Sequence, residues 1–137
     1  MLKEKMKQHI KPLLILAVIF LVVDLLWLKF VVGDLWKTNV ETVQKSPMEI
    51  KSHYAILSYL LLMLGTYYFV YLTIDKENYV KESLIKGFIS GFIIYGVFDF
   101  TNLAIFKEFD LKTAIIDMLW GGTLTAGALV LTNKLIR

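Results

Sequence analysis

The chain of 137 residues contains no cysteine, only two prolines and few charges, since 20% of its residues are Asp, Glu, Lys or Arg. Without cysteine it has no disulfide scaffold, no thiolate metal centre and no cysteine nucleophile. A typical soluble domain is roughly 25% charged and 45–50% apolar, whereas this chain is 57% hydrophobic with a mean hydropathy of +0.62. These values exclude a water-soluble enzyme and predict one compact transmembrane domain over residues 1–137.

Common enzyme and nucleic-acid-binding patterns are also missing. The sequence has no G-x-S-x-G, no H-E-x-x-H, no phosphate-binding loop and no dinucleotide fingerprint. Its net charge of +3 comes from lysines scattered among apolar segments rather than from a basic stripe. We therefore expect no nucleic-acid partner, assign no catalytic residue, cofactor or metal, and favour a protein that is not an enzyme.

What the chain does have is four apolar segments, each close to the roughly 20 residues that cross a bilayer as a helix: Leu13–Val32, Tyr54–Ile74, Leu84–Phe106 and Leu111–Leu131. They predict an all-α fold, a four-helix transmembrane bundle with helices at about 13–32, 47–74, 80–106 and 111–133. The first segment is not a cleaved signal peptide, because its apolar run continues past Trp27 to Val32 without a cleavage site. We expect a multi-pass protein of the plasma membrane, in contact with the lipid bilayer.

The ends of the helices carry local signals. Ser46-Pro47-Met48-Glu49 predicts the start of the second helix, with Ser46 as its cap. Asp34 is expected to cap a short amphipathic helix that lies flat on the bilayer, its apolar face formed by Leu35, Trp36, Val40 and Val43. Tyr67, Tyr68 and Tyr71 are interpreted as an interfacial aromatic belt.

The last two helices are predicted to form an antiparallel hairpin, because only Lys107-Glu108-Phe109-Asp110 joins them. Asp110 is the expected cap of the final helix. Gly87-x-x-x-Gly91 and Gly122-x-x-x-Ala126 match small-residue patterns that allow two helix backbones to approach closely.

The distribution of Lys and Arg predicts the orientation of the chain. If the N-terminus is inside, nine of the 15 basic residues lie on the inner side and six on the outer side. Both termini are therefore expected to be cytoplasmic.

Three carboxylates, Asp24, Asp99 and Asp117, lie within the apolar segments. An Asp near the middle of a transmembrane helix costs about 2.5–3.5 kcal/mol, so all three should face the bundle interior. At about 1.5 Å rise per residue they lie about 3, 6 and 9 Å outside the midplane, in one layer of the outer half. No Lys, Arg or His shares that layer, so we expect it to hold protons, a cation or a cationic ligand, or neutral hydrogen-bond donors.

Residues three or four positions away share a helix face with these acids and complete the candidate binding site: Asp24, Trp27, Tyr95, Asp99, Asn102, Asp117 and Trp120. We predict a pocket formed by the first, third and fourth helices, with the second as a packing wall. It binds or carries a lipid, small molecule or cation, and carriage would require a homodimer, because four helices are few for alternating access. The alternatives are a lipid-modifying intramembrane enzyme or accessory subunit and a purely structural network of hydrogen bonds.

Three motifs follow one another along the chain: Asp24-x-x-Trp27, Tyr95-Gly96-x-x-Asp99-x-Thr101-Asn102-Leu103 and Asp117-x-x-Trp120-Gly121. In this order and spacing the sequence resembles an uncharacterised, mainly bacterial membrane-protein family catalogued as domain of unknown function 2177. The resemblance implies a small four-helix integral membrane protein without an established activity. Because members often accompany genes for lipid modification, it also implies a lipid-related role.

Overall fold

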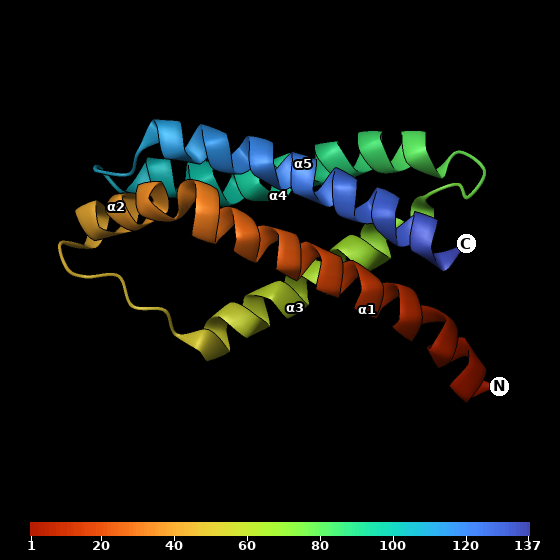
Figure 1. Ribbon diagram of the computed structural model, residues 1–137. Coiled ribbons are helices and arrows are strands. Elements are labelled where there is room, and N and C mark those ends of the chain that lie inside the picture. Colours follow the sequence, from red (N-terminus) through yellow and green to blue (C-terminus); the bar gives the residue numbers. More distant parts are fainter.

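The computed structural model describes all 137 residues and contains helices but no strands. Its elements are α1 (Leu2–Trp27), a π-helix (Leu28–Val32), α2 (Gly33–Gln44), α3 (Ser52–Phe69), a 3₁₀ turn (Tyr71–Thr73), α4 (Tyr79–Ile105) and α5 (Leu111–Ile136). Figure 1 shows an elongated bundle with both termini at one end and α2 at the other. Four helical stretches are long and apolar enough to cross a membrane. The prediction of an all-α protein with four candidate spans is confirmed.

The first helix is longer than predicted, because it begins at Leu2 and continues into α2 as one helical stretch of 43 residues. Gly33 has helical dihedral angles, and Asp34 lies in the first turn of α2 without capping it. No helix-breaking residue separates the two parts, and the five-residue π-helix absorbs the change in direction (Figure 1). The prediction of a separate, Asp34-capped surface helix is therefore wrong.

Instead, α2 packs against the end of the α4–α5 pair. The ring of Trp36 lies 6.3 Å from Phe98 and 6.2 Å from Phe109, measured between ring centroids. The side chain of Asn39 is buried and accepts a hydrogen bond from the backbone N–H of Asp110 at 2.8 Å. These contacts turn one face of α2 toward protein.

The second predicted helix begins six residues later than Ser46, at Ser52, and its cap residue Lys51 makes no side-chain cap. Lys45 ends α2 in the left-handed conformation, with φ of 60°. The side-chain amide of Gln44 then donates to the carbonyl oxygens of Ser46 and Pro47 at 3.1 and 2.8 Å. These bonds hold the chain in a connection without regular structure, so the Ser46 cap prediction is wrong.

Helices α4 and α5 form the hairpin that the sequence predicted. A Cβ atom added to Gly87 would lie 2.7 Å from the Cα atom of Ala126, and one added to Gly91 would overlap the carbonyl oxygen of Gly121. Only glycine allows backbones this close. The backbone N–H of Thr113 donates to the Asp110 carboxylate at 3.0 Å, which confirms the predicted cap of α5.

The apolar core lies in the half of the bundle that contains the termini. Leu16 and Phe20 of α1 and Leu129 of α5 are fully buried, and the C-terminal half of α3 adds Met63 and Tyr67. Tyr71 is buried as well and only Tyr68 is exposed, so the predicted aromatic belt is mostly core. The N-terminal half of α3 diverges from α1 (Figure 1).

Candidate functional site

Asp24 of α1 connects three helices. Its carboxylate, 6% exposed, accepts a hydrogen bond from the Tyr59 hydroxyl of α3 and another, at 2.9 Å, from the indole Nε1–H of Trp120 on α5. Both donors are neutral. Asp24 is therefore stabilised in the helix bundle without a basic side chain.

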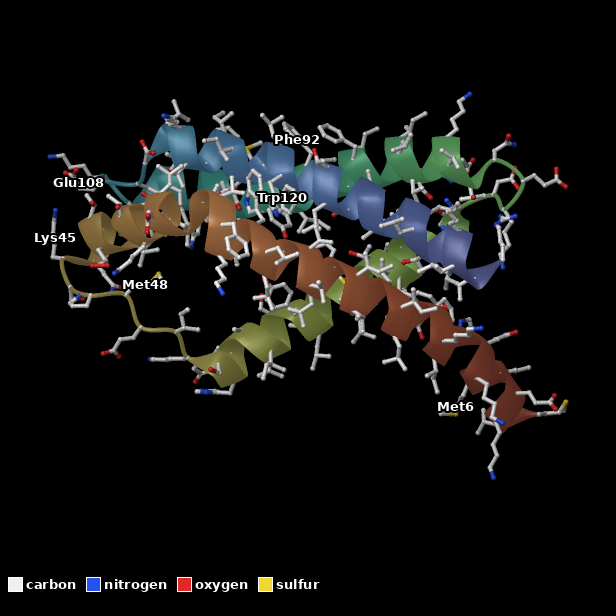
Figure 2. All side chains as sticks on the ribbon, in the orientation of Figure 1. Met6, Lys45, Met48, Phe92, Glu108 and Trp120 are labelled. Carbon is white, nitrogen blue, oxygen red and sulfur yellow. The ribbon has the colours of Figure 1, made fainter.

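Two stacked tryptophans support the hydrogen bond between Trp120 and Asp24. The rings of Trp27 and Trp120 stack with centroids 4.1 Å apart and planes at 5° to each other. Figure 2 shows Trp120 in the space between α1 and the α4–α5 pair. The stack fixes the orientation of the Trp120 indole and hence the direction in which its N–H points toward Asp24.

Asp99 and Asp117 form a second group, on facing sides of α4 and α5. Asp99 is fully buried, and neither of its carboxylate oxygens has a hydrogen-bond partner. Its carboxyl group lies near that of Asp117. Two neighbouring carboxyl groups repel each other when both are ionised, so this arrangement favours a state in which at least one of them carries a proton.

The last two residues of the predicted site, Tyr95 and Asn102, lie in different surroundings. Tyr95 packs its ring against Gly121, where any Cβ atom would collide with it. Asn102 does not join the group: its backbone carbonyl accepts from the N–H of Phe106 at 2.8 Å, and its side chain makes no hydrogen bond. Asn102 lies nearly one turn beyond Asp99, toward the end of α4.

A groove with a volume of about 650 Å³ lies beside these residues and is open on one side. Eleven of its fifteen lining residues are hydrophobic, and none is Lys, Arg or His. Asp24 and Asp117 supply its carboxylates, and Trp27, Tyr95 and Trp120 supply aromatic walls. Asp99 does not line the groove.

The largest contribution to this groove comes from α3, the helix predicted to be only a packing wall. Six residues of α3 line it: Ala55, Ser58, Tyr59, Leu61, Leu62 and Gly65. That prediction is wrong because α3 diverges from α1 at this end and turns a whole face toward the opening. Tyr59 and Trp36 were missed. The spacing of Ala55, Tyr59 and Leu62, four and then three residues apart, is the signal that places a polar residue on this face.

Comparison with known proteins finds one family. The model of a family described as "Predicted membrane protein (DUF2177)" matches residues 9–133, a range that includes every residue of the groove. No curated protein and no solved structure matches the chain.

Proposed function

The chain belongs to the DUF2177 family of predicted membrane proteins, and from this premise we propose that it binds an amphiphile with a cationic group in the groove. One observation carries the proposal: Asp24 and Asp117 lie in a mainly apolar groove that contains no basic side chain. Ligand sites are commonly apolar clefts of about 300–1,000 Å³ with a few converging polar groups.

The charges in the groove favour a cation over an anion. Asp24 accepts two hydrogen bonds, both from neutral donors, and no basic side chain lines the groove. A positively charged amine next to Asp24 and Asp117 would supply the missing countercharge, since a carboxylate in low dielectric interacts strongly with a nearby cation. An anionic ligand would face repulsion from both.

The apolar part of the ligand would lie along the walls. Trp27 and Trp120 form a continuous aromatic surface, and Leu61 and Leu62 of α3 face it across the groove. Gly65 has no neighbour within 4 Å of the position of a Cβ atom, which leaves space for an alkyl chain. Such a ligand is a lipid or a lipid-like small molecule.

The neighbouring acids Asp99 and Asp117 give the site a further property. A cation at Asp117 would favour the ionised form of that carboxylate, and a proton that it held would move to Asp99 or be released. Only in the second case would ligand binding be linked to proton release. We limit the function to binding, because transport by four helices would require a second copy of the chain.

In the same proposal both termini lie in the cytoplasm and the groove opens toward the outer leaflet of the plasma membrane. The excess of nine basic residues over six supports this orientation. Because the chain has no cysteine, Lys3→Cys and Lys107→Cys are unique labelling sites at opposite ends. In intact cells a membrane-impermeant maleimide should label only the second variant, and labelling of the first alone would reverse the orientation.

The three tryptophans provide a direct test of binding, because all of them, Trp27, Trp36 and Trp120, line the groove. The purified protein in detergent is titrated with a brominated long-chain amine, and quenching of tryptophan fluorescence is measured. A fatty acid and an alcohol with the same brominated chain correct for partitioning into the micelle. We expect the amine to bind at least about tenfold more tightly than either.

A matched pair of variants tests the site. Asp24→Asn/Asp117→Asn should abolish the preference for the amine, whereas Asp34→Asn, at an exposed position outside the groove, should retain it. Equal quenching by all three probes in the wild type would contradict the proposal. If the double variant instead only melts at a lower temperature, the acids are a structural network.

A lipid-modifying enzyme is the second candidate, and the two unlike acid environments favour it. Asp24 accepts two hydrogen bonds, whereas the buried Asp99 has no hydrogen-bond partner, and unlike environments of this kind separate a base from an acid. This reading predicts that expression of the wild type changes the membrane lipid composition and that Asp99→Asn abolishes the change at an equal protein level. Unchanged lipids in both strains would exclude it.

A further inference from the structure

A second hollow, with a volume of about 380 Å³, lies at the other end of the bundle. Lys7, His9 and Lys11 of α1 line one side, and Lys76, in the link between the 3₁₀ turn and α4, lines the other. Figure 1 shows this link at the end where the two termini lie, far from α2. We call this the basic hollow; it shares no residue with the groove.

The positive charges of the basic hollow are not neutralised by the protein. No Asp or Glu lines it, and the two ion pairs of the chain involve Lys37 and Lys86 instead. Asp75 and Glu77 flank Lys76 along the link, but neither lines the basic hollow or forms an ion pair with its lysines. The Asp75 carboxylate instead accepts the backbone N–H of Glu77 and the amide of Asn78 at 3.1 and 3.0 Å. The lysines of the basic hollow are therefore available to an anion from outside.

Within the basic hollow, His9 is held by a contact with a buried tyrosine. Its Nδ1 lies 2.7 Å from the hydroxyl of Tyr67, whose side chain is 1% exposed and stacks on Tyr71 at 5.0 Å. When that hydroxyl donates to Nδ1, the proton of the neutral imidazole is on Nε2. The partly exposed ring then presents an N–H donor beside the lysines.

The depth of the basic hollow matches that of lipid headgroups. Lys11 precedes the first apolar segment at Leu13 by two residues, and Lys76 follows the buried Ile74 by two. Leu72 lines the basic hollow and is 46% exposed. Phosphate-bearing groups and the first part of an acyl chain meet at this level of a bilayer.

We propose that the basic hollow is a binding site for the phosphate headgroup of an anionic phospholipid. Lys7, Lys11 and Lys76 contribute the charge and His9 a directed hydrogen bond, while Leu72 contacts the acyl chain. Basic recesses between helices at a membrane surface are suited to this ligand, since each Lys near the surface adds attraction to anionic lipid. The site does not depend on the function of the groove.

Native mass spectrometry of the full chain, released from detergent with dioleoyl-phosphatidylglycerol or dioleoyl-phosphatidylcholine, tests the proposal. The wild type should bind one phosphatidylglycerol at least about tenfold more tightly than phosphatidylcholine. Lys7→Gln/Lys11→Gln/Lys76→Gln should lose that preference. The matched control Lys51→Gln/Lys107→Gln/Lys112→Gln removes the same charge at the opposite end, where Figure 2 labels Lys45 and Glu108, and should retain it.

Three results would overturn the site. They are equal binding of the two lipids, equal losses in the two triple variants, and complete displacement of the bound lipid by inorganic phosphate at the same concentration, which would make it a site for the free ion. Because all six substituted lysines are exposed, both variants should fold. Repeating the measurement on Asp24→Asn/Asp117→Asn separates the two sites, since lipid binding at the basic hollow should be unchanged there.

Discussion

The α4–α5 pair and the α1–α3 pair are built by opposite means within one bundle. Helices α4 and α5 approach closely along their length because glycines face each other across the contact, as Gly91 faces Gly121. Helices α1 and α3 bury a shared apolar core only near one end, where Phe20 and Tyr67 are buried. Beyond that point the large side chain of Tyr59 stands between them and reaches Asp24.

This difference explains where a ligand has room. Contact between backbones excludes any space between two helices, whereas side chains of unequal size leave gaps. The groove therefore lies along α3 and not between α4 and α5. The rigid pair also positions Asp117 and Trp120, so it provides a fixed surface against which α3 forms the opposite wall.

The largest effect should come from forcing the close pair apart. Gly91→Leu places a side chain against the backbone of Gly121 and against Thr125, and neither backbone can move without separating the helices. We expect a loss of at least about 3 kcal/mol in the free energy of unfolding, seen as failure to accumulate or a much lower melting temperature. Gly127→Ala, which meets nothing within 4 Å, should melt like the wild type. If Gly91→Leu and Gly127→Ala melted at the same temperature, close contact between the backbones of α4 and α5 would be refuted.

The next largest effect should come from removing the acceptor that joins α1 to α3 and α5. Asp24→Ala leaves the Tyr59 O–H and the Trp120 N–H without their partner. An unsatisfied buried donor costs about 1–3 kcal/mol. Thermal unfolding should show a smaller loss for Asp24→Asn, which keeps one acceptor oxygen. If alanine and asparagine destabilise the protein equally, the hydrogen bonds contribute nothing.

A smaller effect is expected at the start of α5. The side-chain hydroxyl and backbone N–H of Thr113 donate to the Asp110 carboxylate at 2.5 and 3.0 Å and lower its pKa. Because the folded-state pKa is below the unfolded value of about 3.9, the stabilisation is present above that pH and is lost as the pH falls through the folded pKa. Asp110→Ala should cost about 0.5–2 kcal/mol at neutral pH.

Melting temperatures of the wild type and Asp110→Ala, measured from pH 7 down to pH 2, check this. The difference between the two curves should shrink toward the acidic end. A constant difference across that range would mean that the carboxylate charge has no part in the cap.

The smallest effect on stability, with a large effect on binding, is expected in the loose pair. Gly65→Leu adds a side chain where nothing lies within 4 Å of its Cβ position, in the groove itself. Its melting temperature should stay within about 2 °C of the wild type, because no packed atom is displaced. Quenching by the brominated amine should weaken at least about tenfold. Leu64→Phe, outside the groove, should change neither, and full binding by Gly65→Leu would place the ligand elsewhere.

Local features of the sequence predicted much of the fold. Four runs of apolar residues predicted four spans, and the small residues Gly87 and Gly91 predicted the close helix pair. Asp110 was correctly predicted to cap α5. The start of the second helix was missed, because the Ser46 signal is outweighed by the left-handed Lys45 and by the bonds of Gln44 to the next two carbonyls.

Spacing along a single helix also predicted several of the residues that line the groove. It placed Trp27 and Tyr95 with the acids, but it included Asn102 and omitted Tyr59. A side chain on the same helix face as Asp99 can still lie at a different depth in the bundle. Asn102 lies nearly one turn further along α4 than Asp99. Tyr59 belongs to another helix, so no spacing rule relates it to Asp24.

By itself the sequence determined that the chain is helical, that four apolar segments are long enough to span a bilayer and that three carboxylates must turn inward, because each of these follows from local composition and from the cost of charge in lipid. Only the tertiary structure decided how each helix is rotated and tilted. A transmembrane helix is apolar on every side, so its pattern does not mark one face for burial. Contacts between side chains settled that α3 diverges, that Tyr59 meets Asp24 and that Asp99 is buried outside the lining of the groove.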